Sequence, residues 1–86
     1  MGGGVSMKSR EAVVLRILEL LESQNITVNY LATISAVPPT TLKNIIYGET
    51  ENPGIVTIAK LCDGFEITMK DFFSSELFEN LDQEIE

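Results

Sequence analysis

Histidine and cysteine, the side chains that hold structural zinc or form disulfides, are scarce in this 86-residue chain. Histidine is absent, and cysteine occurs once, at Cys62. A single cysteine cannot form an internal disulfide, which is consistent with a reducing cytoplasm. Structural zinc sites use four Cys or His ligands, so no ordinary zinc site is expected. Cys62 itself stands in an apolar stripe with helical spacing, and we interpret it as a buried core thiol rather than a redox sensor.

Long apolar runs are also missing. No segment approaches the roughly 20 apolar residues of a transmembrane helix, so no membrane span is expected. The carboxylates are scattered, and the only glycine run, at residues 2–4, lies in a leader (residues 1–7) that we interpret as flexible or as a cloning remnant. Without a histidine or a phosphate-binding loop, the sequence does not indicate an enzyme, and no cofactor or metal is expected.

Positive charge is in short supply. The formal net charge is −7, from six Lys or Arg against thirteen Asp or Glu. Five of the acidic side chains lie in residues 74–86, which contain no cation, so that only −2 remains for residues 1–73. A nearly neutral body with an acidic tail predicts weaker electrostatic attraction to nucleic acid than a basic domain would have.

The most informative pattern present lies at residues 27–48, TVNYLATISAVPPTTLKNIIYG. Thr27 is a typical N-cap for a first short helix. Pro38 and Pro39 mark the start of a second, because the first turn of a helix tolerates a missing N–H. Gly48 ends this second helix. The spacing predicts two short helices joined by a tight turn, which is a helix-turn-helix.

The second helix of this motif has two different sides. Its apolar side is formed by Leu42, Ile45 and Ile46. Its polar side, with i, i+3, i+4, i+7 spacing and no carboxylate, consists of Thr40, Lys43, Asn44 and Tyr47. Amide, hydroxyl and ammonium groups read base edges or neutralise phosphates. We therefore interpret residues 38–47 as a recognition helix for the major groove, the alternative being an ordinary solvated helix face.

Three more helices are expected around this motif. The first spans about residues 9–23, with Ser9 as N-cap and a buried stripe of Val14, Ile17, Leu18 and Leu21. The next follows a loop at residues 48–54 and buries Ile58, Leu61, Cys62 and Phe65. A capping box at Thr68–Asp71 begins the last one. The fold class is all-α: a compact five-helix bundle at residues 8–73, with an amphipathic acidic tail at 74–86 that can add a sixth helix.

The order and spacing of these features resemble the Cro and phage-repressor type of helix-turn-helix regulator, also called the xenobiotic-response-element family. The resemblance spans about residues 9–73 and is carried by Ile26-Thr27, Leu31-Ala32, Val37, Thr41-Leu42, Ile45, Tyr47-Gly48, Asn52-Pro53, Thr57-Ile58, residues 61–65, Ile67-Thr68 and Phe72-Phe73. It implies a phage-repressor-like five-helix bundle that binds operator DNA, usually as a dimer, and regulates transcription.

The resemblance also implies which residues contact DNA. Bases would be read from Pro39, Thr40 and Asn44. Phosphates would be contacted from Thr27, Val28, Lys43, Tyr47 and the loop at 49–52, with Thr41 in the same DNA-binding set.

Five positions depart from the family pattern. Val28 replaces a frequent Gln, so the side-chain contact with phosphate is lost. The backbone N–H groups at that helix start can still bind a phosphate. Pro39 replaces a residue that hydrogen-bonds a base, so that an apolar contact remains. Glu49 and Glu51 occupy a loop that is often basic. Ala36 replaces the usual turn glycine, and it is strained if the turn needs a positive φ.

The last helix and the tail contain more apolar surface than a small core needs. The residues are Phe72, Phe73, Leu77, Phe78, Leu81 and Ile85. We expect them to form a homodimer interface. The alternative is that the tail folds back and closes the core of the monomer.

Two functions of different class fit these observations. The first is a sequence-specific transcriptional regulator whose partner is a double-stranded DNA operator. The second is a protein-interaction module on the same fold, such as an antitoxin or anti-repressor, whose acidic surface binds a basic partner of unknown identity. Salt distinguishes them, because DNA affinity falls steeply as the salt concentration rises.

Overall fold

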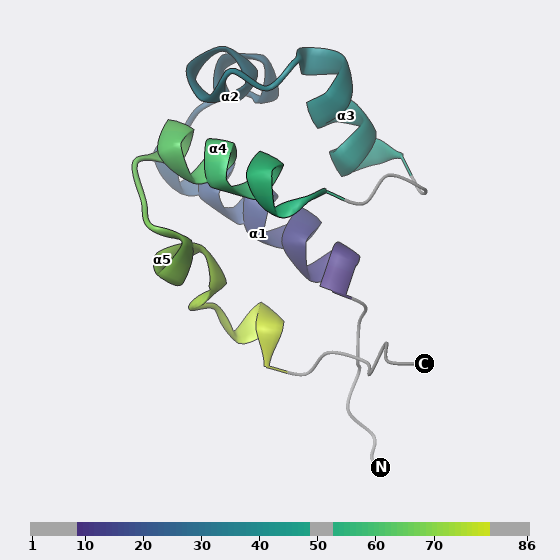
Figure 1. Ribbon diagram of the computed structural model, residues 1–86. Helices are drawn as coiled ribbons and strands as arrows, with labels where there is room; N and C mark the ends of the chain where they lie inside the picture. Colours follow the sequence, from purple (N-terminus) through teal and green to yellow (C-terminus); the bar gives the residue numbers. More distant parts are fainter. Residues whose placement is uncertain (1–8, 49–52, 80–86) are drawn as a thin grey trace.

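The computed structural model of the protein describes residues 9–48 and 53–79. Its elements, in chain order, are α1 (Ser9–Gln24), α2 (Val28–Ser35), α3 (Pro39–Tyr47), α4 (Ile55–Phe65), α5 (Met69–Phe73) and the short 3-10 helix η1 (Glu76–Phe78). The described ranges contain no strand, and the all-α five-helix fold is confirmed. Helices α1 and α4 cross the middle of the molecule, with α2 and α3 at one end and α5 and η1 at the other (Figure 1).

The core lies where the apolar sides of the five helices meet. Its largest fully buried side chains are Ile17, Leu31, Leu42, Ile45, Leu61 and Phe72. Burial of each contributes roughly 1.5–3 kcal/mol, which is substantial for a domain of this size. The predicted stripe of α4 is confirmed, since Ile58, Leu61, Cys62 and Phe65 are all buried.

The predicted stripe of α1 is partly wrong. The buried residues are Ala12, Val13, Ile17, Leu20 and Leu21, whereas Leu18 is 38% exposed and Val14 is half-buried. Apolar residues occupy most positions between 12 and 21, so helical spacing alone could not fix the rotation of this helix. Contacts of α1 with α3 on one side and with η1 on another decide it. Ser9 is the first described residue and already lies within the helix.

Three helices end in the left-handed backbone conformation without a glycine. Asn25, Ala36 and Glu66 have φ of 57°, 59° and 62°. The residue after each one is aliphatic and packs on the core. Its N–H donates to a carbonyl oxygen of the preceding helix: Ile26 to Leu21 over 3.0 Å, Val37 to Ala32 over 3.2 Å and Ile67 to Cys62 over 3.0 Å. The strain expected at Ala36 is therefore present, because a Cβ disfavours this region.

Close contact between α2 and α4 depends on Gly64. A Cβ at Gly64 would lie 2.9 Å from the Cβ of Ser35, which is closer than two carbon atoms can pack. Ser35 is buried, and its hydroxyl donates to the Leu31 carbonyl oxygen over 2.6 Å. The missing side chain of Gly64 thus lets the helix-turn-helix sit directly on α4.

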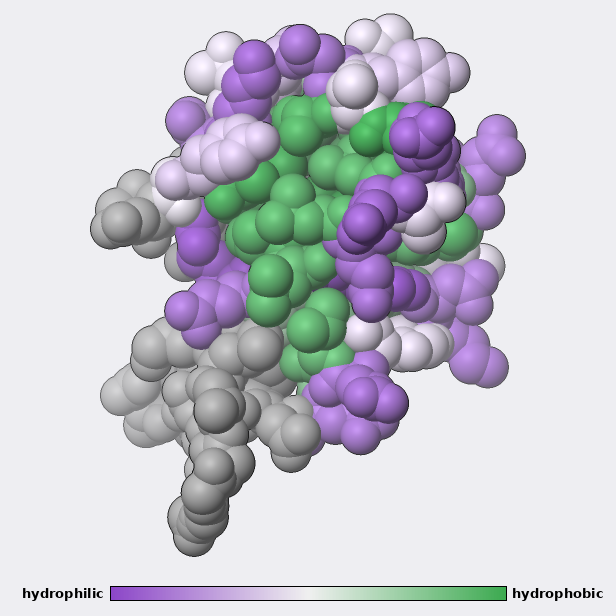
Figure 2. Space-filling model, turned by 180° about the vertical axis from the view of Figure 1, so that it is seen from behind, coloured by the Kyte–Doolittle hydropathy of each residue, from purple (hydrophilic) through white to green (hydrophobic). Residues whose placement is uncertain are grey.

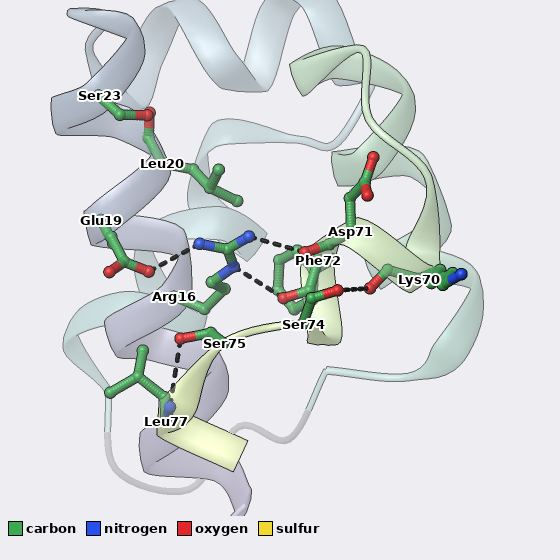
Figure 3. A network of polar contacts seen from close by, with 10 residues as sticks. All are labelled: Arg16, Glu19, Leu20, Ser23, Lys70, Asp71, Phe72, Ser74, Ser75 and Leu77. Carbon is green, nitrogen blue, oxygen red and sulfur yellow. Dashed lines mark hydrogen bonds and ion pairs between the residues drawn. The ribbon is translucent and has the colours of Figure 1, made fainter. Parts of the chain in front are cut away.

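Arg16 of α1 fastens α5 to the bundle (Figure 3). Its Nε donates to the Phe72 carbonyl oxygen and its Nη2 to that of Asp71, both over 2.7 Å. Both carbonyls lie in the last turn of α5, and that of Asp71 also accepts from the Ser74 N–H over 3.2 Å. The predicted N-cap at Thr68 is confirmed, since its Oγ1 accepts from the Asp71 N–H over 3.0 Å. Both ends of this short helix are therefore capped.

Candidate nucleic-acid interface

The two sides of α3 are as predicted. Leu42 and Ile45 are 0% and 1% exposed and Ile46 is also buried, so one side is committed to the core. The other side faces solvent and consists of Thr40, Lys43, Asn44 and Tyr47. Among the residues that the resemblance added, Pro39 is exposed and Thr41 is half-buried. The structure thus places a continuous polar stripe without carboxylates along the outside of this helix.

The ends of α3 are set by the residues that the sequence marked. Pro38 is the N-cap and Pro39 the first helical residue, and the Leu42 N–H donates to the Pro38 carbonyl over 3.0 Å. At the other end the Gly48 N–H donates to the Asn44 carbonyl over 2.9 Å. A Cβ at Gly48 would lie 2.6 Å from that same oxygen, so a larger residue would break this end.

The start of α2 is the second predicted DNA contact. Thr27 caps it, because its Oγ1 accepts from the Tyr30 N–H over 3.0 Å. Val28 packs its side chain against the core, so a contact with phosphate there falls to backbone N–H groups of the first turn, which lack intrahelical acceptors. The loop residues Glu49 and Glu51 lie outside the described residues.

Arg10 of α1 lies at the C-terminal end of α3. Its Nη2 donates to the Ile45 carbonyl oxygen over 3.0 Å and also to the Gly48 carbonyl oxygen. Nothing in the sequence pattern marked Arg10 as a residue near the recognition helix. No spacing rule links position 10 to positions 45 and 48, so only the folded arrangement reveals the contact.

The residues predicted for a dimer interface have unequal exposure. Phe72 is 0% exposed, so it belongs to the core of the monomer and has no surface to offer a partner. Phe73 is 38% exposed, and Leu77 and Phe78 are half-buried. The rings of Phe72 and Phe78 both contact that of Phe73, with centroids 5.0 Å and 4.9 Å from it. Leu81 and Ile85 lie outside the described residues.

Several other aliphatic side chains are at least as exposed as this cluster. Ile55 and Val56, at the start of α4, are 63% and 65% exposed. On α1, Leu15 is 42% and Leu18 is 38% exposed. Apolar side chains gather on the face seen from behind, on which α1 lies (Figure 2). Of these four residues, only Leu18 had been assigned to the core from the sequence, and no exposure was predicted for the other three.

Cys62 lies in the core, as expected. Burial raises the pKa of its thiol, and the neighbouring Asp63 carboxylate raises it further. A protonated, buried thiol is a poor nucleophile and a poor metal ligand. The described residues contain no group of three or more Cys, Asp or Glu that could hold a metal ion. Among the same residues, no helix has the length and apolar character needed to cross a membrane.

Comparison with known proteins agrees with this arrangement. The model of the Cro/C1-type helix-turn-helix DNA-binding domain matches residues 16–76, which is most of the chain. The chain belongs to this family of DNA-binding domains. Its fold is similar to the crystal structure of the prophage Lp1 protein 11, with a TM-score of 0.76 and 29% sequence identity over 87% of this chain and 99% of that chain. No curated protein matches the sequence.

Proposed function

We propose that this protein is a sequence-specific transcriptional regulator that inserts α3 into the major groove of a double-stranded DNA operator. The observation that carries the proposal is the exposed, carboxylate-free stripe on α3 opposite a fully buried side. Membership of the Cro/C1-type family supports it. A helix with one side fixed in the core can present the other side rigidly to base edges.

Each side chain of the stripe has a chemical role in this proposal. Asn44 can pair with adenine through two hydrogen bonds, and Thr40 can contact a thymine methyl or a base edge. Lys43 and Tyr47, which are neighbours on one side of this stripe, contact phosphates. The backbone at Thr27 and Val28 holds a further phosphate at the start of α2. Pro39 offers only an apolar contact.

Substitutions on α3 test the proposal. On the best operator, Asn44→Ala should cost roughly 1–3 kcal/mol of binding free energy and relax the preference at one base pair. Lys43→Ala should weaken binding to all sequences about equally, because a phosphate contact carries no sequence information. Fluorescence anisotropy with operator and scrambled duplexes measures both effects. If both variants remain folded and bind as the parent does, α3 does not read the groove.

A homodimer follows from the small number of phosphate contacts. One unit with a single cation on α3 offers about three or four contacts, and two units on half-sites one helical turn apart double them. We place the interface at Phe73 with Leu77, Phe78, Leu81 and Ile85. Phe72 is left out because it is buried in the monomer.

Sedimentation equilibrium at micromolar concentration tests the dimer. Phe73→Ser and Leu81→Ala should each shift the species from dimer to monomer and weaken operator binding together. The matched control is Val56→Ser, which removes a more exposed apolar side chain at the start of α4. A monomeric parent would contradict the dimer, and dissociation by Val56→Ser alone would move the interface to α4.

A protein-interaction module is the second candidate, and one observation favours it. The outward side of α1 combines the half-exposed Leu15 and Leu18 with the exposed carboxylate of Glu22 and that of Glu19, which also accepts from Arg16 Nη1 over 2.7 Å. A partner with an apolar and basic surface fits this composition. The part of this affinity that comes from the leucines would change little as the salt concentration rises, whereas the affinity for DNA would fall steeply.

A further inference from the structure

One cation of α1 is committed to the end of the proposed recognition helix. Arg10 lies 35 residues before Ile45 and 38 before Gly48, yet its Nη2 donates to the carbonyl oxygens of both. Ile45 belongs to the last turn of α3, and Gly48 is its C-cap. Carbonyls at this end have no intrahelical donor, and the negative end of the helix dipole favours a cation.

A chain of hydrogen bonds connects Arg10 to the stripe. Arg10 donates to the Gly48 carbonyl, and the Gly48 N–H donates to the Asn44 carbonyl over 2.9 Å. The same Arg10 also holds Ile45, the residue after Asn44. The last turns of α3, which carry Lys43, Asn44 and Tyr47, are therefore hydrogen-bonded to α1 at the C-terminal end of the helix. Without these bonds, a helix end frays.

We propose that Arg10 is a positioning residue for DNA recognition: it fixes the last turn of α3 and thereby aims Asn44 and Tyr47 without touching DNA. The proposal rests on the function proposed above. Base readout requires a side chain held to within a fraction of an ångström, so a looser turn loses discrimination between bases before it loses attraction to phosphates.

Arg16 provides a matched control on the same helix. It donates to the Asp71 and Phe72 carbonyls at the C-terminal end of α5, which lies at the opposite end of the molecule from α3 (Figure 1). Both arginines therefore cap a helix C-terminus from α1. Arg16→Met removes a cap of the same chemistry without touching α3. An effect that comes only from a general loss of stability should therefore appear in Arg16→Met as well as in Arg10→Met.

The first experiment uses the free protein. Amide hydrogen exchange is followed by NMR in the parent, Arg10→Met and Arg16→Met, and each protection factor is compared with the global unfolding of its own variant. Arg10→Met should lower the protection of Tyr47 and Gly48 about tenfold, because a hydrogen-bonded charged cap is lost, and Arg16→Met should leave it unchanged. Equal protection in all three proteins would overturn the proposal.

The second experiment measures binding to operator and scrambled duplexes over a range of salt. Arg10→Met should reduce the preference for the operator about tenfold and leave the slope of log affinity against log salt unchanged. Arg16→Met should keep the full preference. Arg10→Lys should restore part of it, because an ammonium keeps the charge but lacks the planar fork.

Three results would overturn the positioning role. A slope that falls by about one in Arg10→Met would mean that Arg10 contacts a phosphate itself. Equal losses of preference in Arg10→Met and Arg16→Met would mean a general effect of stability. An unchanged preference in both Arg10 variants would show that the contact is irrelevant to readout. A parent without any preference contradicts the proposed function instead, and hydrogen exchange then still shows whether Arg10 holds α3.

Discussion

The two ends of the molecule are fastened to α1 in the same way but present different surfaces. At one end Arg10 holds the last turn of α3, and at the other Arg16 holds that of α5. Helix α3 puts its aliphatic residues into the core and keeps a polar outer face, whereas α5 and η1 close the core with aromatic rings. The same kind of anchoring therefore supports an exposed polar helix face at the first end and a closed aromatic cluster at the second.

The largest effect that should separate the two ends is on stability. Phe72→Ala removes a fully buried ring from the α5 end and should lower the free energy of unfolding by about 3–5 kcal/mol. Asn44→Ala removes an exposed side chain from the α3 end and should change it by less than about 0.5 kcal/mol. Urea denaturation followed by circular dichroism measures both. A small loss for Phe72→Ala would mean that the α5 end is not part of the folding unit.

A smaller, stabilising effect is expected in the turn before α3. Ala36 has a φ of 59°, a conformation that costs a residue with a Cβ roughly 1–2 kcal/mol of stability. Glycine avoids this strain, but it loses about 0.5–1 kcal/mol because its unfolded chain has more conformational entropy. Ala36→Gly should therefore raise the free energy of unfolding by up to about 1 kcal/mol. Asn25→Gly is the control, and its gain should be smaller because asparagine tolerates this conformation. A loss of stability in Ala36→Gly would show that the turn is not strained.

The sequence predicted the α3 end better than the α5 end for a physical reason. Proline, glycine and threonine mark helix ends, and the spacing of Leu42, Ile45 and Ile46 admits only one buried side. The helix α1 lacks such a constraint, because apolar residues lie all around it, and Leu18 was assigned to the wrong side. The burial of Phe72 could not be separated from that of Phe73, since adjacent aromatic residues give no periodicity.

Contacts between distant segments were also beyond the sequence. Arg10 and Arg16 donate to backbone carbonyl oxygens. Every residue has such an oxygen, so the sequence does not indicate which residues these arginines contact. The exposure of Ile55 and Val56 depends on how α4 crosses the bundle. The close packing of Gly64 against Ser35 also depends on how α4 crosses the bundle, although a glycine inside a predicted helix already indicated a close contact there.

Selection of bound sequences from a random pool of DNA duplexes tests the central claim most directly. We expect the parent protein to enrich a defined motif, and Asn44→Ala to enrich the same motif with the preference lost at one base pair of each half-site. The experiment needs only folded protein, which circular dichroism verifies for both chains. Enrichment of no motif by the parent, or of an identical motif by both proteins, would contradict the assignment of α3 as the helix that reads DNA.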